Sequence, residues 1–212
     1  ENKGKELVKI RLNQKTIPIL ATMAVFILVY TVGSILYTGF FSLRVFTNLF
    51  IDNAFVGVIA VGMTFVIISG GIDLSVGSVI AFVGVLTAKL IHVYHIHPVP
   101  VILLALLFGA LFGFTMGCLI HFFNLPPFLV TLVGMFLARG LAFLTSLDAI
   151  PIKHPFIERI VDFGIPLGFR AWLPATGIIF IVVVLIGIYL SHFTRFGRNT
   201  YAIGGNEQSA IL

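Results

Sequence analysis

The stretch from residue 69 to residue 78 holds a dense group of polar side chains in an otherwise apolar sequence. It reads SGGIDLSVGS, so one carboxylate, Asp73, lies among three hydroxyls beside two adjacent glycines. Carboxylates accept hydrogen bonds, and hydroxyls both donate and accept them. Such groups suit a neutral solute rich in hydroxyls, such as a sugar. The candidate solute pathway consists of Thr64, Ser69, Gly70, Gly71, Asp73, Ser75 and Ser78.

The same stretch interrupts an apolar run from Ala54 to Leu86. Two glycines break a helix easily, and Asp73 or Ser75 can cap the start of a new helix. Irregular backbone at membrane depth survives only where protein or a watery cavity satisfies its polar groups, and a carboxylate there indicates function. The alternative is a tight loop at the cytoplasmic surface with Asp73 as a solvated cap. The spacing alone does not separate the two interpretations.

Other chemistry finds little support in the sequence. His92, His95 and His97 could contact a metal, but no acidic or cysteine partner lies near them, so we interpret them as an interfacial cluster and expect no metal site. The sequence contains no phosphate-binding loop and no hydrolase or metalloprotease motif. We therefore expect a chain that is not an enzyme and binds no cofactor. Energy for any uphill transport would come from a partner or an ion gradient.

Composition predicts the elements that position these groups. The 212 residues are 59% hydrophobic and only 10% charged, whereas soluble domains carry roughly a quarter charged residues. The sequence therefore predicts an all-α, polytopic helical membrane protein. Five of the thirteen basic residues precede the first apolar run, which is a pattern that sets membrane orientation and not a nucleic-acid patch. We expect the lipid bilayer as a partner and no nucleic acid.

About six spans are predicted, with a broken-helix region near residues 69–78. Each span is a mostly apolar stretch of about 20 residues. The predicted spans are Ile17–Tyr37, Leu49–Ser69, Val76–Tyr94, Val99–Phe123, Phe128–Thr145 and Leu173–Phe193.

The basic residues predict the orientation of these spans. Residues 1–16 should stay in the cytoplasm, because Lys and Arg near span ends are held back there. Residues 17–212 then form a transmembrane domain with a periplasmic loop at 146–172 and a cytoplasmic segment at 194–212. Within the loop, residues 155–163 alternate apolar and charged side chains, which predicts a short helix on the membrane surface.

Three glycines lie four residues apart in the fourth predicted span. Gly109, Gly113 and Gly117 therefore share one helix face, and small residues at this spacing let another helix approach closely. We interpret them as static helix packing. A moving helix contact in a gate is the alternative.

Several long motifs resemble one family. Residues 60–78 read AVGMTFVIISGGIDLSVGS, residues 195–207 read RFGRNTYAIGGNE and residues 124–132 read NLPPFLVTL. Together with Ile-Pro-Ile at 150–152, they resemble the ribose-type ABC sugar permeases of bacteria, within the branched-chain permease superfamily. Residues 52–55 and 150–155 are most similar to permeases for galactofuranose.

The resemblance implies the permease subunit of an ATP-driven importer in the bacterial inner membrane. Such permeases have about ten spans and pair with an identical or a related permease. A cytoplasmic ATPase uses the ATP, and a periplasmic binding protein delivers the monosaccharide, here galactofuranose, ribose or a similar sugar. Because the chain stops at Leu212, just before the expected next helix, we expect it to be truncated at its C-terminus.

The resemblance also gives the tail a role. Gly204 and Gly205 would allow a sharp turn, Asn206 would cap a helix start, and Glu207 would favour its positive first turn. In the family, a short cytoplasmic helix of this kind docks on the ATPase, which implies that these four residues couple ATP use to the spans. The alternative from spacing alone is a capped connector.

Two rival functions remain open. One is an ion-coupled secondary transporter with a broken-helix site around Asp73. It would need ionisable groups inside the membrane, for which Asp52, Asp73 and Arg139 are the candidates. The other is a structural membrane subunit or a passive channel. The tail favours the ABC importer, since neither rival needs a docking helix.

Overall fold

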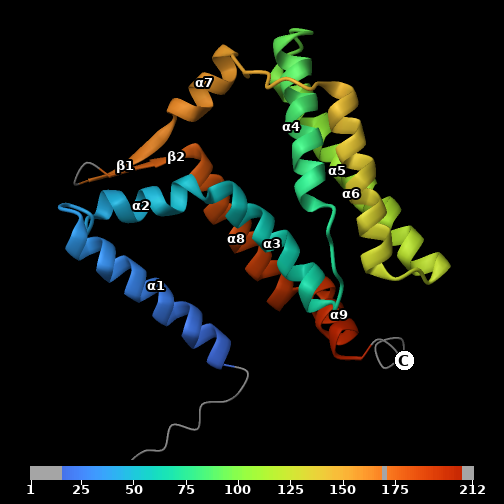
Figure 1. The fold of residues 1–212 in the computed structure, drawn as a ribbon, viewed down its shortest axis with the longest axis horizontal. Helices are drawn as coiled ribbons and strands as arrows, with labels where there is room; N and C mark the ends of the chain where they lie inside the picture. The colour runs from blue at the N-terminus through green and yellow to red at the C-terminus, as the bar shows by residue number, and fades with distance from the viewer. Residues whose placement is uncertain (1–15, 169–170, 207–212) are drawn as a thin grey trace, which may run out of the picture.

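The computed structural model of the chain describes residues 16–168 and 171–206, which are mainly helical (Figure 1). The elements in chain order are α1 (Ile17–Leu36), α2 (Leu43–Asp52), α3 (Ala54–Ile68), α4 (Val76–His92), α5 (Pro98–Phe123), α6 (Pro127–Thr145), α7 (Pro155–Asp162), β1 (Gly164–Gly168), β2 (Ala171–Pro174), α8 (Ala175–Phe193) and α9 (Arg195–Gly205). The predicted all-α, polytopic membrane fold is confirmed.

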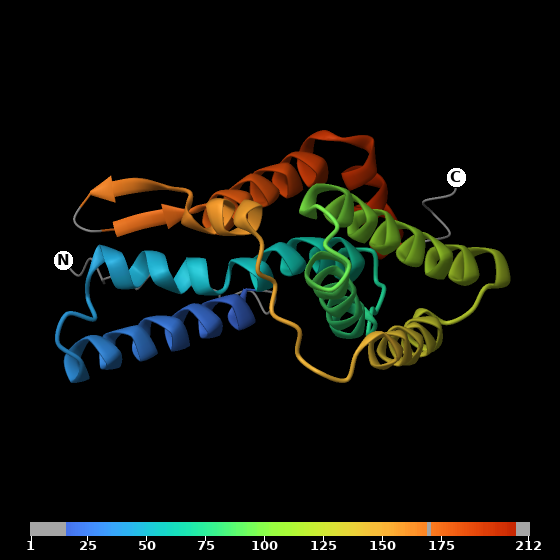
Figure 2. The ribbon, with the colours of Figure 1, turned by 90° about the horizontal axis from the view of Figure 1, so that it is seen from above.

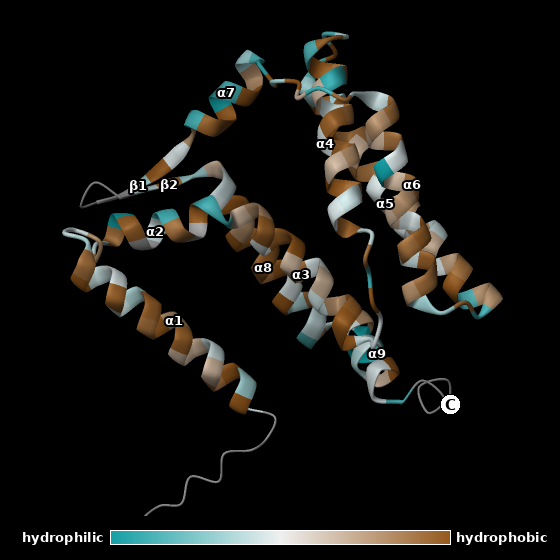
Figure 3. Cartoon of the chain, viewed as in Figure 1, coloured by the Kyte–Doolittle hydropathy of each residue, from teal (hydrophilic) through white to brown (hydrophobic). Residues whose placement is uncertain are grey.

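Each of the six predicted spans contains a helix, although the helices differ in length. Within the described residues, α1, α5, α6 and α8 are long and apolar enough to cross a membrane, and apolar residues dominate them in Figure 3. Helices α2 and α3 form a fifth candidate, a pair bent by 50° near Asn53. The predicted span Leu49–Ser69 therefore contains all of α3 and the end of α2, with the bend between them. Helix α4 is apolar but has only 17 residues.

Six of the helices form two groups, and in Figure 1 the second group lies toward the upper right of the first. Figure 2 shows α1, α2 and the hairpin of β1 and β2 at the end of the molecule away from α5 and α6. In the first group, α3 lies against α8, and α9 folds back beneath them. A Cβ at Gly57 would collide with the ring of Phe180, and one at Gly187 would lie 2.6 Å from Val61. These two glycines therefore permit the close approach of α3 and α8, which is how helices associate in lipid.

The second group consists of α4, α5 and α6. Most of the buried residues of the chain lie along the seam between α4 and α6, including Phe82, Ile91, Val130 and Ala138. Near the end of this seam, Lys89 Nζ donates a hydrogen bond of 2.6 Å to the carbonyl oxygen of Thr145. A cation at a helix C-terminus satisfies a free carbonyl and interacts favourably with the helix dipole.

The segment between α6 and α8 contains the predicted short helix and a hairpin that was not predicted. His154 caps α7, because its Nδ1 accepts from the amide of Phe156 at 3.1 Å. Strands β1 and β2 then pair antiparallel, with Ile165 opposite Leu173. Trp172 lies in β2 and is 47% exposed.

Candidate functional site

The predicted helix break is present, and glycine forms it. Helix α3 ends at Ile68, and Gly70 adopts a left-handed backbone with φ of +79°. The amide of Gly71 donates to Val66 O at 2.9 Å and the amide of Gly70 donates to Ile67 O at 3.0 Å. This pair of bonds is a Schellman motif, which satisfies the last carbonyls of a helix and requires a residue tolerant of positive φ. The chain then runs irregularly to Ser75, and we call residues 69–75 the connector.

Asp73 holds the far end of the connector at the start of α4. Its Oδ1 accepts from the amide of Ser75 at 2.8 Å and from the Ser75 hydroxyl at 2.7 Å. Ser75 itself is buried, with 1% of its surface exposed. The predicted helix cap by Asp73 or Ser75 is not formed: Ser75 is the N-cap residue of α4, but no side chain there accepts from an amide of the first turn. Asp73 instead forms an Asx turn onto Ser75, which places its negative charge near the positive end of α4.

The connector also contacts α6. The hydroxyl of Thr131, which lies one turn inside α6, is within hydrogen-bond distance of Ile72 O at 3.2 Å and of Pro127 O at 2.9 Å. Helix α4 alone spans about 26 Å at 1.5 Å per residue, less than the hydrocarbon core of about 30 Å. For α4 to complete a crossing, the connector has to supply part of it. Figure 1 shows the connector rising from the end of α3 to α4.

A cavity of about 940 Å³ lies where the connector meets α5, α6 and α9. This volume is near the upper end of the range for small-molecule sites. Its polar side chains are those of Ser69, Asp73, Asn124 and Thr131. The other lining residues are Val66, Gly70, Gly71, Ile72, Gly113, Met116, Gly117, Ile120, Leu125, Pro126, Pro127 and Ile203. A few convergent polar groups on apolar walls are typical of a binding site.

Helix α9 closes against the end of α3 beside this cavity. Thr194 caps α9 by accepting from the amide of Gly197 at 3.3 Å. At the other end of α9, a Cβ at Gly204 would collide with the carbonyl oxygen of Ile68. The tail therefore touches the residue that immediately precedes the connector.

Comparison with known proteins identifies the family. Residues 45–212 match the family described as the permease component of the branched-chain amino acid transport system. The chain belongs to this permease family. It is 49% identical to the inner membrane ABC transporter permease protein YjfF of Escherichia coli over 94% of this chain and 60% of that protein.

Two further relatives have names that give a substrate. The chain is 39% identical to the fructose import permease protein FruG of Bifidobacterium longum, over 95% of this chain and 61% of that protein. It is 33% identical to the ribose import permease protein RbsC of Escherichia coli, over 84% and 56%. The chain thus spans about 60% of the length of these permeases. No solved structure matches it significantly.

The predicted pathway residues of this permease chain fall in three places. Ser69, Gly70, Gly71 and Asp73 line the cavity. The side chains of Ser75 and Ser78 are buried instead. The Thr64 hydroxyl donates to Ala60 O at 2.7 Å, and Thr64 faces a separate, smaller cavity between α3 and α8. The structure therefore brings four of the seven together.

The predicted glycine face of α5 does not pack against a helix in the described part of the chain. A Cβ at Gly109, Gly113 or Gly117 would have no described atom within 4 Å. Gly113 and Gly117 line the cavity instead. Spacing within one helix could not show this, because it identifies a shared face but not what lies opposite that face.

The tail of the permease chain also differs from its prediction. Gly204 and Gly205 are the last residues of α9, so the predicted sharp turn at them is wrong. Asn206 is the C-cap of α9, and its amide donates to Ala202 O at 3.0 Å. Glu207, and any helix start after Asn206, lie outside the described residues.

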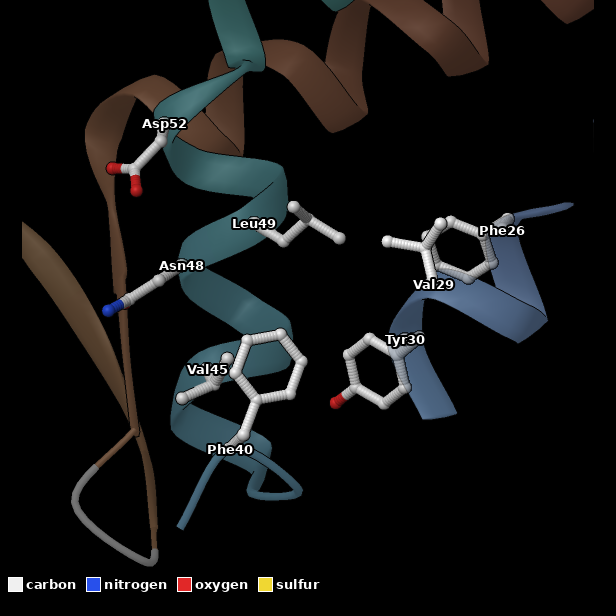
Figure 4. Close-up of a pocket in the computed structure, with 8 residues that line it drawn as sticks. All are labelled: Phe26, Val29, Tyr30, Phe40, Val45, Asn48, Leu49 and Asp52. Atoms are coloured by element: carbon white, nitrogen blue, oxygen red, sulfur yellow. The ribbon is translucent and has the colours of Figure 1, made fainter. Parts of the chain in front are cut away.

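A second cavity, of about 340 Å³, lies between α1 and α2 (Figure 4). Apolar side chains such as Phe26, Val29 and Leu49 face one another across it, whereas Asn48 and Asp52 point away from α1. The carboxylate of Asp52 therefore does not converge on a polar site. We interpret this space as a gap between apolar helices.

Two of the histidines, His97 and His154, cap helices. The Nδ1 of His97 accepts from the amide of Val99 at 3.3 Å at the start of α5, and its ring contacts that of His154 with centroids 5.4 Å apart. Among residues 16–168 and 171–206, no group of three or more His, Cys, Asp or Glu side chains could hold a metal ion.

Proposed function

We propose that the chain is part of the permease subunit of an ATP-driven ABC importer that moves a monosaccharide across the bacterial inner membrane. The observation that carries the proposal is the cavity, which lies where an interrupted crossing meets two continuous helices. Membership of the permease family and the printed names of the relatives support the transport class. The ATPase, a second permease and a sugar-binding protein are the proposed partners. This chain binds no cofactor, and the ATPase uses the ATP.

The lining of the cavity suits a neutral sugar. The carboxylate of Asp73, the hydroxyl of Ser69 and the amide of Asn124 offer hydrogen-bond acceptors and donors. Val66, Met116 and Ile120 supply apolar wall. Few polar groups on apolar walls would let a sugar enter and leave without being held tightly, as a transport pathway requires.

The orientation follows from the basic N-terminus. We place residues 1–16 and 194–212 in the cytoplasm and residues 146–172 in the periplasm. Helix α9, the end of α3 and the turn between α5 and α6 then share the cytoplasmic end, so the cavity lies in the cytoplasmic half. Gly204, Gly205, Asn206 and Glu207 then belong to the segment proposed to couple to the ATPase.

Galactofuranose is the first sugar to test, because residues 52–55 and 150–155 are most similar to permeases for that sugar. Ribose and fructose are the natural comparisons, since named relatives import them. The sugar preference and the transport class are separate statements and need separate controls.

The experiment is uptake of each radiolabelled sugar into membrane vesicles. The vesicles would carry the full-length permease with its ATPase, second permease and binding protein. We expect ATP-dependent uptake of galactofuranose that Glu207→Arg abolishes while the assembly stays intact. Uptake of ribose or fructose alone would reject the sugar preference. Uptake that follows the proton gradient and ignores ATP would reject the ABC importer in favour of the secondary transporter.

A further inference from the structure

The last turn of α9 is part of the cavity and not only a surface helix. Ile203 lines the cavity, as does the turn between α5 and α6. Its neighbour Gly204 lies directly against the end of α3. The same helical turn therefore contributes a wall to the cavity and touches the backbone that leads into the connector.

The contact at Gly204 is a backbone contact. The three atoms closest to a Cβ at this position are Ile68 O, Ile68 C at 2.9 Å and Ser69 Cα at 3.4 Å. No side-chain rotation can relieve a clash with main-chain atoms, so any added carbon has to separate α9 from α3. Glycine is required here because of close approach, and not because of a positive φ.

A second contact fixes the other end of α9 to the same helix. The rings of Phe196 and Phe65 lie with centroids 5.4 Å apart. Thus the first turn of α9 contacts α3 through Phe65, and its last turn contacts α3 through Ile68. Two contacts, one at each end of α9, fix the distance of α9 from α3 and its orientation relative to α3. We therefore expect α9 and the end of α3 to move as one body.

The residues that follow Ile68 make the functional connection. Ser69, Gly70 and Gly71 form the Schellman turn and line the cavity. A displacement of α9 would therefore move Ile203 in one wall and pull on Ser69 in another, with no further element between them. Movement of α9 would thus reach the cavity directly.

We propose that Gly204 is a positioning residue that holds the cavity closed on its α9 side, and that displacement of α9 opens the cavity directly. This inference rests on the proposed function in one respect: the ATPase is the partner that would displace α9. Its structural part, that α9 controls access to the cavity, can be tested without nucleotide.

The test measures how fast a membrane-impermeant maleimide labels Leu125→Cys in vesicles that expose the α9 end. Leu125 lines the cavity from the turn between α5 and α6, and not from α9. The background is the full-length permease in its complex, without other cysteines, so Cys118 is serine. Gly204→Ala is compared with Gly62→Ala, a matched change in α3 where a Cβ meets nothing within 4 Å.

Gly204→Ala should raise the labelling rate about tenfold, since a misfit of one carbon at a tight contact changes an equilibrium by about that factor. Gly62→Ala should label at the unsubstituted rate. Equal rates in the two variants would overturn the proposal. If Gly204→Ala fails to insert, Ile203→Ala tests the same wall: it should also raise the rate, and an unchanged rate would overturn the proposal.

Nucleotide separates this inference from the proposed function. In the complex with Gly62→Ala, ATP should change the labelling rate, and in Gly204→Ala that response should be lost while ATP hydrolysis continues. A difference between the variants without nucleotide, combined with no ATP-dependent uptake in the parent complex, would reject the importer but keep the control of the cavity by α9. A nucleotide response that survives Gly204→Ala would overturn the coupling route.

Discussion

The ammonium group of Lys89 in α4 lies 2.6 Å from the carbonyl oxygen of Thr145 at the end of α6. The two helices run in the same direction, and the lysine satisfies a carbonyl that has no partner within its own helix. This bond joins the short helix after the connector to a helix long enough to span the membrane. It therefore fixes how far α4 is displaced along α6, and with it the position of the connector.

Lys89→Met should destabilise this pairing. The change keeps the length of the side chain but removes the charged donor, and a hydrogen bond to a charged group is worth about 1.5–3 kcal/mol. We expect a lower unfolding temperature in detergent. Lys153→Met is the matched control, because Lys153 lies in an exposed loop. An equal unfolding temperature for both variants would show that the bond contributes nothing.

Thr131→Val should loosen the connector without leaving a hole. Valine keeps the shape of threonine but cannot donate to Ile72 O, and the loss of one neutral hydrogen bond costs about 1 kcal/mol. We expect faster hydrogen exchange in residues 69–75 by mass spectrometry. Thr115→Val serves as the comparison, because that hydroxyl bonds only to Leu111 O within its own helix. Exchange that rises equally in both variants would contradict a role for Thr131.

The hydrogen bond and the negative charge of Asp73 can be tested separately. Asp73→Asn keeps the oxygen that accepts from Ser75, whereas Asp73→Ala removes it at a cost of about 1 kcal/mol, as for other hydrogen bonds. We expect Asn to preserve stability and lower sugar uptake, and Ala to lower both. If Asn transports normally, the carboxylate serves only to start α4. If Asn uncouples uptake from a proton gradient, the secondary transporter gains support.

Gly113 and Gly117 of α5 should determine how large a sugar the cavity accepts. At Gly113 and Gly117 an added Cβ would meet no described atom within 4 Å, so we expect Gly113→Val and Gly117→Val to fold normally. Each new side chain enters the cavity, and uptake should fall more for larger sugars than for smaller ones. Gly109→Val is the control, because this glycine shares the helix face but does not line the cavity. Equal losses at all three positions would instead support the packing of another helix there.

Local patterns predicted the local features well. The apolar runs located the six helical segments, because crossing a membrane demands length and hydrophobicity that are visible in any window of about 20 residues. The break after Ile68 was predicted because two adjacent glycines end a helix whatever surrounds them. The polar contact of Asp73 with Ser75 spans only two residues, but the predicted cap of the first turn of α4 is not formed.

Features that depend on a distant partner could not be predicted in this way. Gly57 and Gly187 approach Phe180 and Val61 across two helices, and neither glycine has another glycine at the four-residue spacing. The end of α9 was misplaced because Gly204 suggests a turn when only its neighbours in sequence are considered. Its real constraint is the carbonyl of Ile68, more than 130 residues earlier in the chain.

The connector has a practical consequence for topology mapping. Its glycines and serines make residues 69–75 look like a loop that would accept an epitope tag or a protease site. Insertions are tolerated where backbone is exposed and free of hydrogen bonds. Here Gly70 and Gly71 close α3, the carbonyl of Ile72 meets Thr131, and Asp73 starts α4. A reporter inserted here would disrupt both crossings it was meant to locate, whereas the stretch between Asp148 and Lys153 offers an extended site for the same label.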